Sequence, residues 1–184
     1  FRLRPDGKPL VLTISVVPAF GPWVDVAQLT KSYWEAVGIK TVVKVEERSI
    51  HYTRIHANKQ QICVWNSGGN AHVLVYPWWV MPWGNSSRLA PLSGVWYQSG
   101  GKGGMRPTKE LMKVIELYEK ARATTDEQER IRLTKEIFRL NSENLWTIGT
   151  VGASPMVMGV IVVKNNFRNV PEKAHNDVVV HTPG

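Results

Sequence analysis

The sequence contains very little cysteine and has no long apolar run. Its one cysteine, Cys63, cannot form a disulfide within the chain, and its place between Ile62 and Val64 predicts a small buried hydrophobic side chain. No apolar stretch reaches the roughly 18 residues that a membrane-spanning helix needs, and the N-terminus lacks the charged and then apolar pattern of a signal peptide. Because the chain begins at Phe1 rather than at Met, we expect it to be part of a longer protein.

Motifs for catalysis are also missing. The nucleophile-elbow pattern G-x-S-x-G does not occur, and the glycine-rich stretch at 99–104 lacks the Lys-Ser/Thr ending of a phosphate-binding loop, which favours a surface turn. The five histidines are dispersed along the chain, so we expect no metal site and no cofactor. These absences predict a binding protein rather than an enzyme.

Acidic residues are absent from Arg48 to Lys109, although the chain as a whole is ordinary in its charge content. The same stretch contains seven cationic residues: Arg48, Arg54, Lys59, Arg88, Lys102, Arg106 and Lys109. A neutral or anionic ligand therefore fits this stretch better than a cation. The net charge of +8 is spread over the sequence with no run of five like charges, so we expect no nucleic-acid partner.

The N-terminal part shows the alternation of strands and helices that is typical of an α/β fold. The apolar and periodic patterns predict a strand at 10–17, a helix at 26–37 that ends at Gly38, a strand at 39–45, a helix at 50–58 capped by Ser49, and a strand at 61–65. Strands separated by single helices favour a mostly parallel sheet with helices packed on it.

Residues 66–107 show neither helical nor strand periodicity and form a long predicted loop. Beyond it, the pattern predicts a helix at 107–123 and a second helix that begins with a capping box of Thr125 and Gln128 and carries Ile131, Ile137 and Phe138 on one face. Further strands are predicted within 146–163 and at 177–181.

Aromatic residues are concentrated in the acid-free stretch. It holds five of the eight tryptophans: Trp65, Trp78, Trp79, Trp83 and Trp96. Indole rings offer flat apolar faces and one N–H donor, which suit sugar rings and peptide side chains, although any one of them could simply fill the core. We expect the binding residues to be Trp65, Asn66, Ser67, Asn70, Trp78, Trp79 and Trp83.

Several segments, in this order, resemble the C-terminal lobe of the family 5 extracellular solute-binding proteins, which include the oligopeptide, dipeptide and nickel receptors of bacterial ABC importers. They are DGKPLVLTI (6–14), YWEAVGIK (33–40), VVKVEER (42–48), VWNSGG (64–69), ELYEKARATTDEQERIRLTKEIF (116–138) and FRNVPE (167–172). The resemblance implies a periplasmic-binding-protein-like α/β lobe over 1–163, with 164–184 returning toward an N-terminal lobe.

The resemblance also implies a function. A cleft between the two lobes would capture a small-molecule solute and deliver it to the permease subunits of an ABC importer, on the periplasmic or extracellular side of the membrane, with or without a lipid anchor. Peptide-binding relatives place an Asp near the position of Asn70, so the missing carboxylate favours an oligosaccharide over an oligopeptide. Two alternatives stay open. One is a fragment of a carbohydrate-active enzyme, with Glu46 and Glu47 as candidate acids in this chain and a catalytic carboxylate pair required from the N-terminal lobe; the other is a basic module that binds polyanions.

Overall fold

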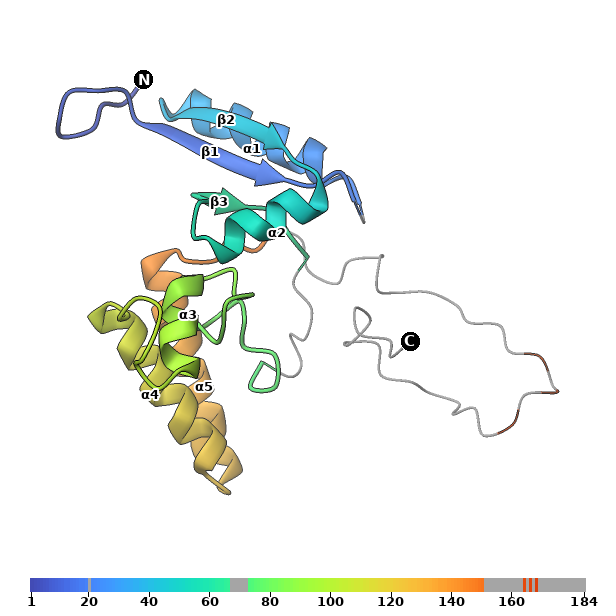
Figure 1. Cartoon of the computed structure of the whole chain (residues 1–184), viewed down its shortest axis with the longest axis vertical. Helices are drawn as coiled ribbons and strands as arrows, with labels where there is room; N and C mark the ends of the chain where they lie inside the picture. Colours follow the sequence, from blue (N-terminus) through green and yellow to red (C-terminus); the bar gives the residue numbers. More distant parts are fainter. Residues whose placement is uncertain (20, 67–72, 151–163, 165, 167, 169–184) are drawn as a thin grey trace.

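The computed structural model describes residues 1–19, 21–66, 73–150, 164, 166 and 168 (Figure 1). The elements in chain order are β1 (Val11–Val16), α1 (Trp23–Ala36), β2 (Lys40–Val45), α2 (Arg48–His56), β3 (Ile62–Cys63), α3 (Pro91–Gln98), α4 (Lys109–Ala123) and α5 (Glu127–Asn144). Figure 1 shows two parts, a sheet with α1 and α2 and a group of helices formed by α3, α4 and α5. None of the helices in the described ranges is long and apolar enough to cross a membrane.

The three described strands form a parallel sheet in the order β2-β1-β3. β1 pairs with β2 along its full length, from Val11 opposite Lys40 to Val16 opposite Val45, whereas it pairs with β3 only at Ile14 and Ser15. The predicted α/β class is therefore confirmed, and the strand expected at 61–65 is shorter than its apolar pattern suggested.

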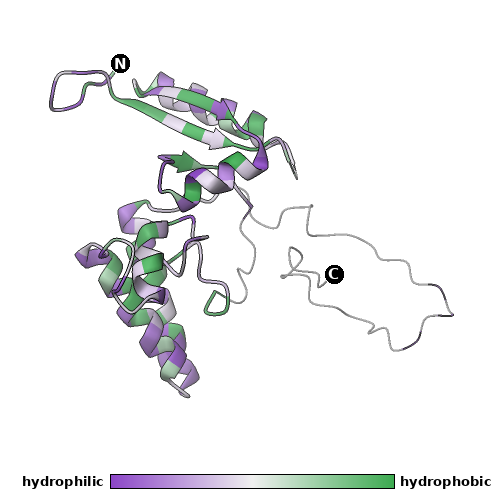
Figure 2. Cartoon of the chain, in the orientation of Figure 1, coloured by the Kyte–Doolittle hydropathy of each residue, from purple (hydrophilic) through white to green (hydrophobic). Residues whose placement is uncertain are grey.

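Helix α1 covers one face of the sheet. Alternate residues of β1 point toward it, so Ile14 and Val16 are buried together with Ala27 of the helix. The helix ends where the sequence predicts, because Gly38 follows it with a φ of +84°, a conformation that glycine adopts without strain. In Figure 2 the strands are mostly apolar and α1 shows both polar and apolar residues. Leu29 and Tyr33 are exposed on its outer side.

The capping residues of two helices differ from the prediction by one or two positions, and α1 and α4 begin at Trp23 and Lys109 rather than at residues 26 and 107. Glu47, not Ser49, caps α2, and its carboxylate accepts hydrogen bonds from the backbone N–H groups of Ser49 and Ile50. Asp126, not Thr125, caps α5 in the same way. A carboxylate accepts such bonds more strongly than a hydroxyl does, and its charge is favoured by the positive end of the helix dipole.

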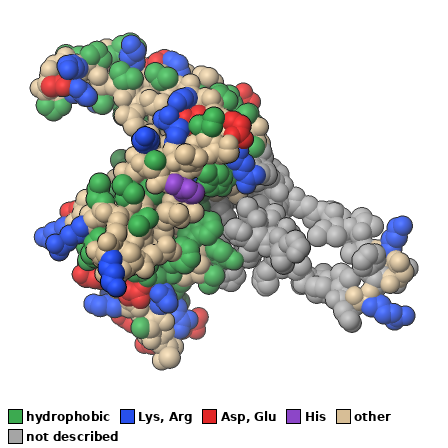
Figure 3. All heavy atoms as spheres, in the orientation of Figure 1, with side chains coloured by type: hydrophobic (Ala, Val, Ile, Leu, Met, Phe, Trp, Pro, Cys, Tyr) green, Lys and Arg blue, Asp and Glu red, His purple; other side chains and the backbone are tan. Residues whose placement is uncertain are grey.

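Helices α4 and α5 form the predicted hairpin and the larger core of the molecule. Val114, Tyr118 and Ala121 of α4 are buried against Leu133 and Ile137 of α5. The expected apolar face of α5 was partly wrong: Ile131 and Phe138 are 41% and 45% exposed, and Asn141 takes a buried place instead. In Figure 3 hydrophobic side chains are also visible on the surface of this helical part.

The long segment after β3 is not a bare loop. It contains α3, and residues 74–80 before α3 accept three hydrogen bonds at their backbone carbonyls, two from the helical hairpin and one from the segment after α5. Tyr118 donates to Leu74 O (2.8 Å), Asn141 Nδ2 to Val80 O (2.7 Å) and Thr147 Oγ1 to Trp79 O (2.7 Å). Apolar periodicity is too short over the eight residues of α3 to predict this helix from sequence.

Among residues 146–150 no strand is formed. The rest of the strand prediction for 146–163, the strand at 177–181 and the proposed division at residue 163 lie outside the described residues.

Candidate ligand-binding site

The strand order places one end of the sheet at a topological switch point. β1 lies between β2 and β3, so the chain moves from β1 to one edge of the sheet and then returns past it to the other edge. In open α/β sheets, ligands bind in the crevice outside the carboxyl ends of the strands where the order reverses. Here those ends follow Val16 in β1 and Cys63 in β3.

Aromatic side chains from three segments meet at this end of the sheet. Trp65, two residues after β3, lies 5.1 Å from the ring of Trp23 in the first turn of α1. Tyr52 of α2 meets the Trp65 ring edge-on at 5.3 Å, and His51 stacks on it at 5.6 Å with an interplanar angle of 16°. We call these four residues, together with Arg48 and Arg88, the switch-point cluster.

Two guanidinium groups lie over the same pair of rings. The guanidinium carbon of Arg88 is 4.9 Å from the ring centres of both Tyr52 and Trp65, and that of Arg48 is 5.8 Å from each. Arg88 is held on the helical part of the molecule, since its backbone N–H donates to Trp78 O and its Nη1 donates to Ser86 O at 2.9 Å. Arg88 thus connects the sheet to the segment before α3.

A buried polar network contacts the cluster at His51. The Glu46 side chain, only 2% exposed, pairs with Arg54 Nε at 3.0 Å and with Lys44 Nζ at 3.3 Å, and its other oxygen is 3.4 Å from His51 Nδ1. Gln60 Nε2 lies 3.0 Å from the same imidazole nitrogen. The network therefore fixes the imidazole plane on which Trp65 stacks.

The surroundings of His51 disfavour its protonated form. Burial lowers its pKa below the ordinary value of 6.5; the positive charges of Arg88 and Arg54 act in the same direction, and Glu46 opposes them. A neutral imidazole between an ion-paired carboxylate and an indole can orient a ring without adding charge to the site.

A second aromatic group lies in the segment before α3. The rings of Trp78 and Trp83 stack at 6.2 Å, and Tyr76 meets Trp78 edge-on at 6.1 Å. Trp79 and Trp83 pack on the core between α4 and α5. The four tryptophans expected to bind the ligand thus fall into two groups, joined through the backbone hydrogen bond from Arg88 to Trp78.

The expected site residues are therefore distributed as follows. Trp65, Trp78, Trp79 and Trp83 are all half-buried, and so is Asn66. Ser67 and Asn70 lie outside the described residues. Sequence reasoning missed the rest of the cluster: Trp23, Arg48, His51, Tyr52 and Arg88.

The two carboxylates considered for an enzyme both have structural roles. Glu46 is enclosed in the network just described, and the Glu47 carboxylate caps α2, which also lowers its pKa through hydrogen bonds with Ser49. Neither is placed as a free acid or base in the site. Among the described residues no group of three His, Cys, Asp or Glu side chains could hold a metal ion.

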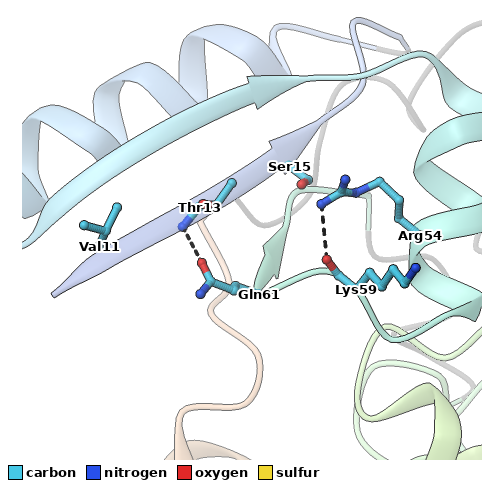
Figure 4. Close-up of a pocket in the computed structure, with 6 residues that line it drawn as sticks. All are labelled: Val11, Thr13, Ser15, Arg54, Lys59 and Gln61. Atoms are coloured by element: carbon cyan, nitrogen blue, oxygen red, sulfur yellow. Dashed lines mark hydrogen bonds between the residues drawn. The ribbon is translucent and has the colours of Figure 1, made fainter. Parts of the chain in front are cut away.

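A polar pocket of about 400 Å³ lies on the sheet face opposite α1, lined by Val11, Thr13, Ser15, Arg54, Lys59 and Gln61 (Figure 4). The Gln61 side chain accepts a hydrogen bond from Thr13 N at 2.8 Å, taking the place of a strand partner there. This contact explains why β3 begins one residue later than predicted. The pocket reaches back to Val11 at the start of β1, away from the carboxyl ends of the strands.

Of three comparisons with known proteins, only the comparison with solved structures finds similar proteins. No family model and no curated protein matches the sequence. Among solved structures, the oligopeptide-binding protein OppA is 28% identical, with a TM-score of 0.65 over 79% of this chain and 25% of that one. NikA from Brucella suis, in complex with Fe(III)-EDTA, is 20% identical and shares the fold, with a TM-score of 0.55 over 78% of this chain and 26% of that one.

The chain spans about a quarter of the length of each of these two proteins. Both are family 5 solute-binding proteins, and the matched fold is the small parallel sheet with flanking helices described above. The resemblance recognised in the sequence is thus confirmed: this chain is similar in fold to one part of a family 5 extracellular solute-binding protein.

Proposed function

We propose that this chain is the C-terminal lobe of a solute-binding protein that captures an oligosaccharide or an oligopeptide between two lobes for import by an ABC transporter. The single observation that carries the proposal is the position of the switch-point cluster. Its rings and guanidinium groups lie outside the carboxyl ends of β1 and β3, where sheets of this type bind ligands.

The contents of the cluster support binding rather than catalysis. Trp65 and Tyr52 provide apolar surface, while Arg48 and Arg88 provide N–H donors beside it. A few convergent polar groups on an aromatic surface are typical of small-molecule sites. The two fold neighbours are named for an oligopeptide and for a complex with Fe(III)-EDTA, which supports a role in solute binding.

The partners follow from the same proposal. An N-terminal lobe would supply the second wall of the cleft, closure would occur by hinge motion, and the closed form would dock on the permease subunits of the importer. This assigns the protein to the periplasmic or extracellular side of the membrane. The division of the chain at residue 163 and the roles of Trp78, Trp79 and Trp83 in the cleft belong to the proposal.

Calorimetric titration of the two-lobe protein tests the function. Neutral oligosaccharides and short peptides are titrated separately, and saturable binding of one class is expected. In the Trp65→Ala variant, affinity should fall at least about tenfold, because a ring that organises the site is lost. The matched control is Trp96→Ala, which removes another half-buried indole, from α3, outside the cluster.

Three results would overturn the proposal. If the protein binds neither class of ligand, the proposed receptor function is wrong. If it hydrolyses a chromogenic glycoside, the alternative of a carbohydrate-active enzyme is favoured. Binding of polyanions alone, with affinity that falls steeply as salt is added, would favour the basic module.

A further inference from the structure

We propose that the polar pocket on the sheet face opposite α1 binds a tetrahedral oxyanion, a phosphate or a phosphate monoester. The groups that hold it are Ser15, Arg54, Lys59 and Gln61. This site is separate from the switch-point cluster and goes beyond the proposed function, on which it does not depend. The pocket volume of about 400 Å³ leaves room for a phosphate together with the group that it esterifies.

The first argument is charge. None of the six residues that line the pocket is acidic, and two of them, Arg54 and Lys59, are cationic. The carboxylate that pairs with Arg54 belongs to Glu46, which does not line the pocket and is shared with Lys44. Among the described residues, Lys59 has no acidic partner. One carboxylate thus serves Lys44 and Arg54 together, and the remaining positive charge at the pocket favours an anion.

The second argument is the supply of unused hydrogen-bond donors. Ser15 is only 1% exposed, it lines the pocket, and its hydroxyl has no hydrogen-bond partner among the described residues. The Gln61 Oε1 atom accepts from Thr13 N at 2.8 Å, which leaves the amide N–H groups of Gln61 to donate to a ligand. In Figure 4, Thr13 and Gln61 lie on one side of the pocket, and Ser15 and Arg54 lie on the other.

The third argument is the fixed position of the Arg54 guanidinium. Its Nη2 donates to Lys59 O at 3.2 Å, and its Nε lies 3.0 Å from a carboxylate oxygen of Glu46. The backbone N–H of Lys59 donates in turn to Arg54 O at 2.9 Å, so the turn after α2 is held at both ends. Figure 4 shows the guanidinium extending toward Ser15. A donor that is already oriented loses little conformational entropy on binding.

The directions of these donors favour a tetrahedral anion over a planar one. Ser15 belongs to β1, Arg54 to α2, and Gln61 directly precedes β3, so the donors reach the pocket from three separate elements. A carboxylate has two oxygens in one plane, whereas a phosphate presents at least three acceptor oxygens in different directions. Phosphate can therefore accept from all three elements at once.

The experiment compares three anions on the full-length protein. Calorimetric titrations at constant ionic strength use inorganic phosphate, phenyl phosphate and acetate. We expect saturable binding of at least one of the two phosphates, and acetate should bind at least about tenfold more weakly, since it satisfies fewer donors. Tighter binding of phenyl phosphate would identify an ester as the ligand, and tighter binding of inorganic phosphate would identify the free anion.

The sharpest variant is Gln61→Glu. The new carboxylate still offers an oxygen to Thr13 N, but it replaces the amide donor by a negative charge inside the pocket. Affinity for phosphate should therefore fall at least about tenfold. Gln128→Glu is the matched control, because it makes the same change at an exposed position in the first turn of α5 and should leave the affinity unchanged.

A second pair of variants keeps the test valid if Gln61→Glu folds poorly. Lys59 is exposed, so Lys59→Gln removes a charge from the pocket without disturbing the core, and affinity for phosphate should fall about tenfold. Lys102→Gln removes the same charge from an exposed position in the turn after α3 and should have no effect.

Three results would overturn the inference, and each leaves the proposed receptor function standing. The first is the absence of saturable binding of either phosphate in the millimolar range. The second is binding of acetate as tight as that of phosphate, which would contradict the tetrahedral geometry. The third is equal phosphate affinity in each variant and its control, which would place the anion outside this pocket.

Discussion

The imidazole of His51 stacks on the indole of Trp65, with ring centres 5.6 Å apart and planes inclined by 16°. His51 is fully buried and in contact with Glu46 and Gln60, whereas Trp65 is half-buried at the end of the sheet. This contact joins the buried polar network to the proposed ligand site. The orientation of Trp65 therefore depends on residues that a ligand would not touch.

Stability should fall as the pH drops below 6.5. Above that value His51 is neutral in both the folded and the unfolded chain, so its titration has no effect. Below it, the unfolded chain takes up a proton that the folded chain resists, because burial lowers the pKa of His51 in the folded state. Urea unfolding at a series of pH values from neutral downward measures this loss.

Two substitutions isolate the contribution of His51. His51→Gln should remove part of the pH dependence of the free energy of unfolding below pH 6.5, since glutamine keeps a polar side chain and cannot titrate in this range. Thr53→Gln, a substitution without a titrating group at an exposed position on the same helix, should leave the dependence unchanged. An identical slope in the protein and in both variants would contradict the assignment to His51.

Gly94→Ala should destabilise the turn that carries Arg88. A Cβ at position 94 would lie 2.4 Å from Gly84 O and 2.5 Å from Gly84 N, so backbone atoms must move. Overpacking of this kind costs about 1–3 kcal/mol in the free energy of unfolding. Gly103→Ala serves as the control, because the nearest atoms there are 3.8 Å away; equal unfolding midpoints for the two variants would disprove the close approach of α3 to Gly84.

Asn141→Ala should cost about 1–3 kcal/mol in the free energy of unfolding, because it leaves the buried carbonyl of Val80 without its donor at 2.7 Å. Asn144→Ala removes an exposed amide that bonds Leu140 O on the same helix, and its effect should stay within about 0.5 kcal/mol. Denaturant unfolding of both variants gives the comparison. If Asn141→Ala lowers the free energy of unfolding less than Asn144→Ala does, the hydrogen bond from Asn141 to Val80 does not hold the segment before α3 on the hairpin.

Tyr97 should ionise only at about pH 12. Burial raises its pKa first, and its hydrogen bond to the Glu119 carboxylate adds to the effect. An NMR titration of the tyrosine ring resonances should show that Glu119→Gln lowers this pKa and that Glu116→Gln, on the exposed side of the same helix, does not. No change in the Glu119 variant would place the cause in burial alone.

The sequence predicted the sheet and the helical hairpin well because their apolar periods are long and regular. The predicted start of a helix differs from the observed one where two residues within a few positions can each cap the helix, as with Glu47 and Ser49. Helix α3 was missed because eight residues with proline and glycine carry no clear period. Ile131 and Phe138 follow helical spacing and yet remain exposed, since spacing alone does not say which residue meets a neighbouring helix.

The site was predicted less completely, for a different physical reason. Trp65 stands out in the sequence because it follows an apolar strand in an acid-free stretch. Trp23 and Arg88 become its neighbours only through the strand order β2-β1-β3 and the turn before α3, and no local pattern reveals either. Parallel strands bring together residues that are far apart in the chain, so such clusters emerge from topology.

The central claim, that solute binds at the switch-point cluster, is tested most directly by the fluorescence of the two-lobe protein on saturation with its ligand. The change in emission should be strongly reduced in Trp65→Phe and preserved in Trp146→Phe, which alters a half-buried indole that packs on the helical core instead. An undiminished change in Trp65→Phe, with ligand affinity equal to that of the unmodified protein, would contradict the account.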